Sequence, residues 1–505
     1  MKLGKHVLEK KTVFLLVFLT LNLTVDFYYT FFGYRASFNS DAAALNLYAI
    51  SIKIQGELFP SNWFYVNGDF WLFGPHLLMY LLNYIFVNQF VIHGISVFIF
   101  YLLIIGLNYK LLKLLKFTTN ESIFGVSILL SIVSISVKEF FYLQGAYSGI
   151  YVCILLSLVL LLKLISKIEK QKIPLQEALL LSVVFSVLIL SNPFRALQWL
   201  IVPCAVYVFI YLRQKNYVKK FILSLKWFFL FSILPILATA FYFWNYSQHT
   251  VQNAIREVPT NDFDKSWNGL GVFLNAFFWL LGIAPGANHK QISIGTLDGF
   301  VHTLLMIFAL RIFLQQRRNL NLNSERTLIF LLMAAIPSCY LIIFSGLGVD
   351  ATAGRYILIP TYIGLTIIFA VIFKSGSYQK VLIMIIIPFL FIANVKDTNL
   401  MNHDLIDQQS KVLSEIEQYS DLGATYWNAS KYQILSNDEV RIQPILWNQE
   451  TCFTSYDWLT SRTLTNKKVS HLLIFDNEWA EISKLNCNFG EVHEKVGFRI
   501  ASLIP

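Results

Sequence analysis

The residue best placed to do chemistry is an aspartate that comes soon after the first apolar stretch. Asp41 lies in the segment Phe38-Asn39-Ser40-Asp41-Ala42. At the outer rim of a membrane span, its carboxylate could act as a general base that takes a proton from an acceptor hydroxyl as that oxygen attacks a sugar carbon. The alternative is structural, because an aspartate before the predicted helix over 42–54 also suits a helix N-cap. The residue types alone leave both interpretations open.

A second aspartate follows in the same predicted loop. Asp69 ends the segment Asn67-Gly68-Asp69 and could bind a metal or the acceptor. The competing interpretation is an ordinary turn, because Asn, Gly and Asp are typical turn residues. We keep Asp69 as an acceptor or metal candidate.

Two arginines stand at the outer ends of predicted spans. Arg195 follows Asn192-Pro193-Phe194, and Arg355 precedes Tyr356 at the start of a later span. Guanidinium groups can hold a lipid-linked phosphate through paired hydrogen bonds. The alternative is that both side chains extend to lipid headgroups, as arginines near span ends commonly do.

The composition indicates the kind of protein that must position these residues. The chain has 505 residues, of which 56% are hydrophobic and 14% are charged, whereas a soluble domain has about 25% charged residues. It contains no P-loop, GxGxxG or HExxH motif. We therefore predict an α-helical polytopic membrane protein with about 11 transmembrane helices. The predicted spans are 12–33, 91–109, 122–137, 147–165, 176–192, 197–212, 221–243, 298–314, 327–346, 357–373 and 381–395.

The apolar segment 72–88 is interrupted by polar residues, and we predict that it lies in the membrane interface. With this choice, Lys and Arg concentrate in the same set of alternate connections, beginning with Lys2, Lys5, Lys10 and Lys11. The positive-inside rule then places the N-terminus in the cytoplasm and the C-terminus outside. The Lys and Arg residues behind the net charge of +10 are thus distributed according to the predicted membrane topology. The charge therefore does not indicate a nucleic-acid partner.

Three outer segments are long. They are 34–90, 244–297 and the C-terminal region from 396. The second contains an apolar stretch over 271–283 that is too short to span and is expected in the interface. Short apolar runs at 440–445, 472–475 and 497–503 read as strands. We therefore divide the chain into a transmembrane catalytic domain, 1–395, and a small periplasmic α/β domain, 396–505.

Two of the five cysteines lie in the outer C-terminal region. Cys452 and Cys487 would share an oxidising compartment, and they are not part of a CxxC pair. We predict a disulfide between them.

This layout resembles the GT-C membrane glycosyltransferases. Asp41 matches the acid that follows the first span in that family, and Gly74-Pro75-His76 matches its Pro-led interfacial helix. Arg355-Tyr356, with Pro360 downstream, is similar to the late Arg-Tyr element. Ala42 stands where members often have a second acid. This argues against a metal site built on an acid pair and leaves a divalent metal as an open question.

The resemblance implies an inverting transfer of sugar from a polyprenyl phosphate to an acceptor on the outer face. Asp41 would be the catalytic base, and Arg355, Tyr356 and Arg195 would bind the donor phosphate. Length and layout are most similar to the phage-type O-antigen glucosyltransferases. We therefore expect a multi-pass enzyme of the bacterial inner membrane that moves glucose from undecaprenyl phosphate to an O-antigen or other surface glycan.

The alternative is a transporter or flippase of a lipid-linked saccharide. Such a protein is expected to carry paired polar groups near mid-membrane and two related halves. The polar residues of this chain gather at the outer rim instead, and no internal duplication is visible.

Overall fold

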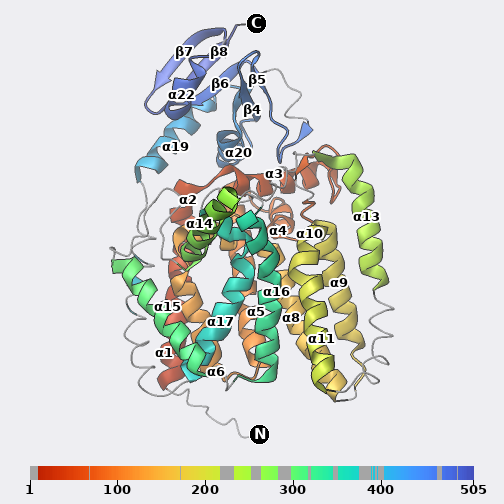
Figure 1. Cartoon of the computed structure of the whole chain (residues 1–505). Coiled ribbons are helices and arrows are strands. Elements are labelled where there is room, and N and C mark those ends of the chain that lie inside the picture. Colours follow the sequence, from red (N-terminus) through yellow and green to blue (C-terminus); the bar gives the residue numbers. More distant parts are fainter. Residues whose placement is uncertain are drawn as a thin grey trace.

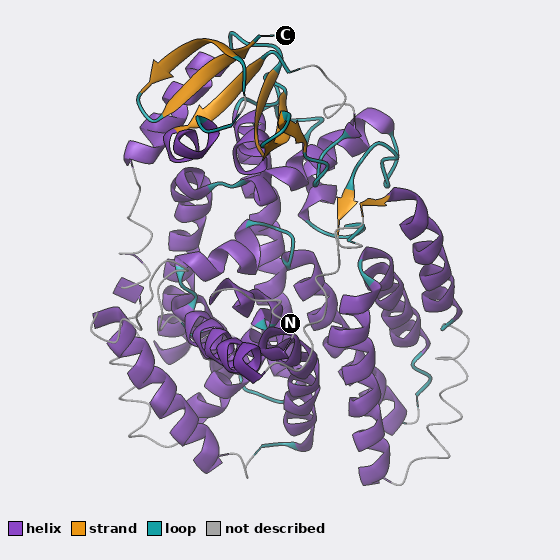
Figure 2. Ribbon diagram, turned by 45° about the horizontal axis from the view of Figure 1, so that its top comes forward, coloured by secondary structure: helices purple, strands orange, loops and turns teal. Residues whose placement is uncertain are grey.

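The fold is known from a computed structural model, which describes residues 10–66, 69–170, 172–215, 232–251, 263–281, 297–316, 320–344, 351–374, 388, 391–392, 395, 403–462, 469–485 and 487–504. Helices fill most of the molecule, and the strands of a small sheet gather at one end (Figures 1 and 2). We call these parts the helical region and the outer domain, a name that refers only to its place at one end of the molecule. The Asn67-Gly68 turn lies outside the described residues.

The helices of the helical region follow the predicted spans closely. Their bounds are α1 Lys10–Tyr28, α2 Tyr34–Ser37, α3 Ser40–Gln55, α4 Pro75–Leu82, α5 Gln89–Leu114, α6 Thr119–Ile132, α7 Ile135–Lys138, α8 Ser148–Glu169, α9 Leu175–Ser191, α10 Pro193–Ala196, α11 Val202–Lys215, α13 Ile233–His249, α14 Phe263–Leu280, α15 Leu297–Gln316, α16 Leu322–Phe344 and α17 Leu358–Lys374. Three short π-helical segments are η1 Tyr29–Gly33, η2 Glu139–Leu143 and η3 Leu197–Ile201, and η5 Ala351–Tyr356 is a short 3₁₀ helix.

Five helices in the described part are long and apolar enough to cross a membrane: Lys10–Ser37, Gln89–Leu114, Ser148–Glu169, Pro193–Tyr211 and Leu322–Phe344. Shorter apolar helices occupy Leu175–Ser191, Ile233–Asn245, Leu304–Gln316 and Leu358–Lys374, which coincide with four more predicted spans. The chain is therefore a multi-pass membrane protein. The predicted span over 381–395 lies almost wholly outside the described residues, so the number 11 stays a prediction.

One predicted span differs in detail from the structure. The predicted span over 122–137 is broken after Ile132, and the following helix, Ser136–Leu143, is bent from it by 106°. The break falls at Val133 and Ser134, just before the helix that carries Lys138 and Glu139. The segment 72–88 forms α4, whose eight residues are too short to cross a bilayer.

The outer domain is a mixed six-stranded sheet with the strand order β5-β4-β3-β6-β8-β7. The central strands β3, β4 and β6 run parallel, and the other three are antiparallel to their neighbours. Their bounds are β3 Leu422–Thr425, β4 Ile442–Asn448, β5 Cys452–Ser455, β6 His471–Phe475, β7 Phe489–Lys495 and β8 Phe498–Leu503. The three predicted strands correspond to β4, β6 and β8.

The outer-domain sheet has a separate small core on each face. Because side chains alternate along a strand, Leu473 of β6 packs with α19 (His403–Ile416) and α20 (Tyr426–Leu435). Its neighbours Leu472 and Ile474 pack on the other face with α22 (Asp476–Ile482). Helices α19 and α20 therefore cover one face of the sheet, and α22 covers the other.

Helix α20 joins the outer domain to the helical region. Its Ala429 and Tyr432 belong to the outer-domain core, whereas Tyr426, Ile434 and Leu435 belong to the core of the helical region. Figure 1 shows α20 directly above α3. The start of α3, where Asp41 lies, is therefore covered by the outer domain.

Candidate functional site

Asp41 lies in the first turn of α3, and the structure shows that it does not cap this helix. The cap is Asn39, whose Oδ1 accepts a hydrogen bond of 3.0 Å from the backbone N–H of Ala42. The N-cap interpretation of Asp41 is therefore wrong. A residue two positions earlier already satisfies the helix end, so the Asp41 carboxylate is left for other contacts.

Two neutral side chains hold the Asp41 carboxylate, one on each oxygen. The Tyr426 hydroxyl donates to Oδ1 at 2.8 Å, and the Gln144 amide donates to Oδ2 at 3.1 Å. Burial raises the pKa of Asp41 above its ordinary value. Tyr426, Arg355 and Gln144 act in the opposite direction, because each favours the charged carboxylate. The Asp41 carboxylate is therefore shielded from water and has a raised pKa. Within the described residues it has no ion-pair partner.

A second carboxylate lies close to Asp41. Glu139 of η2 accepts hydrogen bonds at its Oε1 from the Tyr34 hydroxyl at 2.9 Å and the Asn39 amide at 2.8 Å. The charge of Asp41 acts on Glu139 and helps to raise its pKa, which burial already raises. Glu139 and Gln144 were not among the residues predicted from the sequence. The available signal was a Lys-Glu pair that interrupts an apolar run at 138–139. The Tyr426 contact had no comparable signal, because 385 positions separate it from Asp41.

Arg355 reaches the same site from η5. Its Nη2 donates to the Tyr356 hydroxyl at 3.1 Å, and its guanidinium lies 5.5 Å from the ring centroid of Phe140. Its buried Nε has no hydrogen-bond partner among the described residues. Gly354 lets η5 pack closely on α14, since a Cβ added there would lie 2.8 Å from the Ala276 carbonyl oxygen of α14.

Arg195 and Asp69 form an ion pair. Their side chains are 3.2 Å apart, and the Asn192 amide also donates to Asp69. Burial raises the pKa of Asp69, while Arg195 and Asn192 favour its charged form. The backbone N–H of Asp69 also donates to the Val66 carbonyl at 3.0 Å, as a turn would require.

Tyr147 links the two arginines. The Arg195 guanidinium lies 5.1 Å from its ring centroid, and both Arg195 and Arg355 act electrostatically on its hydroxyl. The two positive charges also repel each other. The structure therefore brings together all five residues predicted for the site: Asp41, Asp69, Arg195, Arg355 and Tyr356.

The side chains at this site do not suit a metal ion. Within the described residues, no three His, Cys, Asp or Glu side chains come together as a metal site would need. Asp69 already engages Arg195 and Asn192. We therefore derive no chemical step through a metal.

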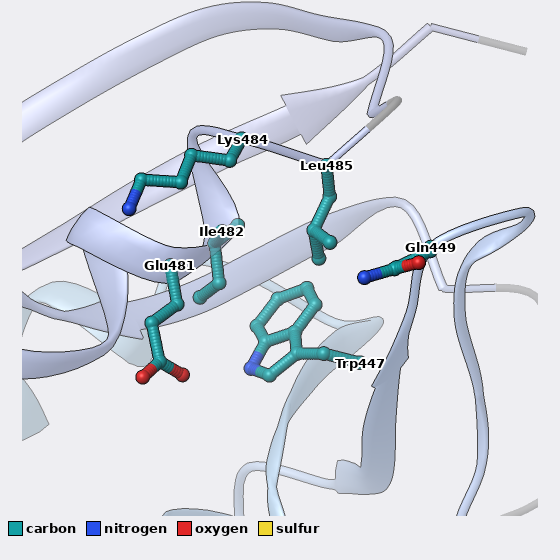
Figure 3. Close-up of a pocket in the computed structure, with 6 residues that line it drawn as sticks. All are labelled: Trp447, Gln449, Glu481, Ile482, Lys484 and Leu485. Atoms are coloured by element: carbon teal, nitrogen blue, oxygen red, sulfur yellow. The ribbon is translucent and has the colours of Figure 1, made fainter.

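A separate cleft of about 520 Å³ lies in the outer domain (Figure 3). It is lined by Trp447, Gln449, Glu481, Ile482, Lys484 and Leu485, which places it on the α22 face of the sheet. Asp41 lies under the opposite, α20 face. Close to the cleft, the structure joins Cys452 to Cys487 in a disulfide.

Comparison with known proteins shows a shared fold. No protein-family model matches the chain, and no curated protein matches it. A solved structure of ArnT from Cupriavidus metallidurans, bound to undecaprenyl phosphate, is similar with a TM-score of 0.57 and 10% identity, over 97% of this chain and 98% of that one.

Two structures of the oligosaccharyltransferase of Archaeoglobus fulgidus are also similar. Each has a TM-score of 0.50 and 10% identity and covers 97% of this chain. One, tethered to an acceptor peptide, is covered over 74% of its length; the other, in complex with an inhibitory peptide and a dolichol-phosphate, is covered over 75%. The fold of this chain is therefore similar to that of ArnT and of this oligosaccharyltransferase.

Proposed function

We propose that the protein is an inverting glycosyltransferase that uses a polyprenyl-phosphate sugar as donor. The observation that carries this proposal is the Asp41 site. A shielded carboxylate held by two neutral donors lies beside Arg355, on a fold shared with structures that contain undecaprenyl phosphate or dolichol-phosphate. Such a carboxylate suits a general base, and an arginine near it suits a lipid phosphate.

The proposed reaction is a single displacement. Asp41 takes the proton of the acceptor hydroxyl while the acceptor oxygen forms a bond to the anomeric carbon. The bond from that carbon to the phosphate oxygen breaks, and its electron pair leaves with the lipid phosphate. Arg355, with the Tyr356 hydroxyl beside it, compensates the charge that develops on the leaving phosphate. Attack opposite the leaving group inverts the anomeric configuration.

Arg195 has a different role in this proposal. Because it is paired with Asp69, its charge is largely compensated before a donor arrives. We propose that it shapes the phosphate site through Tyr147 and contributes less to phosphate binding than Arg355.

The finer parts of the proposal concern sugar, acceptor and place. We propose glucose as the sugar, an O-antigen or other surface glycan as the acceptor, and the periplasmic face of a bacterial inner membrane as the location. The supporting arguments are the lysine pattern and the similarity to phage-type O-antigen glucosyltransferases. An alkaline phosphatase fused after residue 505 should be active, and one fused at Lys116 should be silent; the reverse pattern would refute this orientation.

One feature would also suit a transporter. Asp26 and Lys138 form a buried ion pair at 2.6 Å, and Tyr101 donates to Asp26. Buried ionisable groups within membrane spans commonly mark transport pathways. Here the pair joins α1 to α7. Lys138 directly precedes Glu139 in the chain, so the ion pair supports the segment that carries Glu139 and Gln144. We therefore favour a positioning role for it.

The proposed function is tested by mass analysis of surface glycans from cells with the wild-type chain, Asp41→Asn and no chain. We expect one added sugar only with the wild type. Asp404→Asn, an exposed acid on α19, is the matched control and should behave as wild type. Sugar addition by Asp41→Asn at the wild-type level would refute the proposed base.

A further inference from the structure

The starts of α3 and α20 are connected in both directions. The Ser40 hydroxyl donates to the Tyr426 carbonyl at 2.5 Å, and the Tyr426 hydroxyl donates to Asp41 at 2.8 Å. Neighbouring residues of α3 thus hold both ends of one tyrosine of the outer domain. Tyr426 is only 4% exposed, and its ring lies 6.0 Å from that of Tyr456. Its position is therefore well defined by packing and by hydrogen bonds.

We propose that Tyr426 is a positioning residue for the Asp41 base, so that the outer domain completes the catalytic site of the helical region. This inference rests on the proposed function. A carboxylate offers about four acceptor positions, and Tyr426 and Gln144 occupy one on each oxygen. The remaining positions can receive the acceptor hydroxyl. Because both donors are neutral, they orient the carboxylate without cancelling the charge that a base needs.

The competing explanation is that Tyr426 only docks the outer domain. The two explanations differ in what happens to Asp41 when the hydroxyl is removed. A hydroxyl that donates to the charged carboxylate lowers its pKa. Tyr426→Phe should therefore raise the midpoint of Asp41 titration, whereas a residue that serves only packing would leave this midpoint unchanged.

Other charged and titratable groups also face Asp41 and are unchanged in this variant. They come from α2, η2, η5 and the segment after β5, and they are Tyr34, Glu139, Arg355 and Tyr456. Since all four stay in place, a shift in Tyr426→Phe reports the lost hydroxyl.

The test is pH-difference infrared spectroscopy of the purified full-length protein. The Asp41 carboxyl band is assigned by its loss in Asp41→Asn. Tyr426→Phe should move the midpoint of that band upward by about one to two pH units, the size expected for one hydrogen bond to a charged group. Tyr432→Phe is the matched control, because Tyr432 lies on the same helix but packs on Phe475 in the outer-domain core. It should leave the midpoint unchanged.

The acid limb of sugar transfer in cell membranes should move with the spectroscopic midpoint in Tyr426→Phe. An unchanged midpoint in this variant would overturn the inference, even if transfer is reduced. Should Tyr426→Phe fail to reach the membrane, Ser40→Ala, which removes the bond to the Tyr426 carbonyl, should give a smaller upward shift, and no shift would overturn the inference. Failure of the proposed function is a separate result, namely wild-type transfer by Asp41→Asn.

Discussion

The segment between α1 and α5 carries two aspartates that the structure places in different surroundings. Asp41 receives hydrogen bonds from two neutral groups, Tyr426 and Gln144. Asp69 instead forms an ion pair with Arg195 at 3.2 Å. Burial raises the pKa of both, but a directly bonded cation opposes the shift only at Asp69.

This difference separates an acid that can react from one that holds structure. A base must be charged, shielded and able to accept a proton, and an arginine bonded to it would oppose protonation. Asp41 meets these requirements better than Asp69. The same comparison separates the arginines, because Arg355 bonds only Tyr356 among the described residues, whereas Arg195 is already paired.

The largest effect should follow the loss of the Asp41 carboxylate. Asp41→Asn keeps the size of the side chain but removes the base, which should lower sugar transfer by about 10²- to 10⁴-fold. Asp69→Asn should lower it less, because it acts through the Arg195 contact. Turnover in membranes with matched protein levels checks this order, and equal losses would remove the distinction between the two acids.

Arg355 should come next. Arg355→Ala should reduce turnover more than Arg355→Lys, because lysine keeps the charge but loses the planar fork that binds phosphate. Arg195→Lys should cost less than Arg355→Lys, since Arg195 already faces Asp69. Wild-type turnover in Arg355→Ala would favour the headgroup interpretation.

The pH dependence should reflect the raised pKa of Asp41. Only the charged carboxylate can accept the proton, so transfer should fall as the pH drops through this pKa. The acid limb should therefore lie above the ordinary aspartate value of about 3.9. An acid limb at or below that value would show that Asp41 is not the titrating base.

The Asp69–Arg195 pair should act as one unit. Asp69→Asn and Arg195→Gln should each destabilise the protein, because each leaves a mostly buried charge without its partner. The double variant should lose less than the sum, with a coupling of about 0.5–3 kcal/mol. A thermal-unfolding cycle of the four proteins measures this coupling, and strict additivity would mean that the pair contributes nothing.

The smallest effect on transfer should come from the disulfide. The Cys452–Cys487 bond spans 35 positions and joins segments next to the Gln449 and Leu485 side of the outer-domain cleft. Replacing both cysteines by serine should destabilise the outer domain by about 3–4 kcal/mol in the chain-entropy model and leave turnover nearly unchanged. Free, alkylatable thiols in unreduced, denatured wild-type protein would show that the bond does not form.

Much of the helical region could be predicted from the sequence, because long apolar runs and the lysine pattern are local properties. Nine of the predicted spans coincide with apolar helices in the described residues. The two interpretations that the structure contradicts also concern local features. Asn39 rather than Asp41 caps α3, since either residue type suits that position. The predicted span over 122–137 breaks after Ile132, because an average of hydropathy does not report a bend in the backbone.

The sequence by itself determined a multi-pass helical protein with a small outer domain, and it identified Asp41, Asp69, Arg195 and Arg355 as candidates. Only the tertiary structure decided their partners. Tyr426 meets Asp41 across 385 positions, Gln144 across 103, and Asp69 selects Arg195 rather than Arg355. Hydropathy and spacing report which face a residue belongs to. Contacts between distant segments depend on how whole helices and the outer domain pack, and no local pattern records that packing.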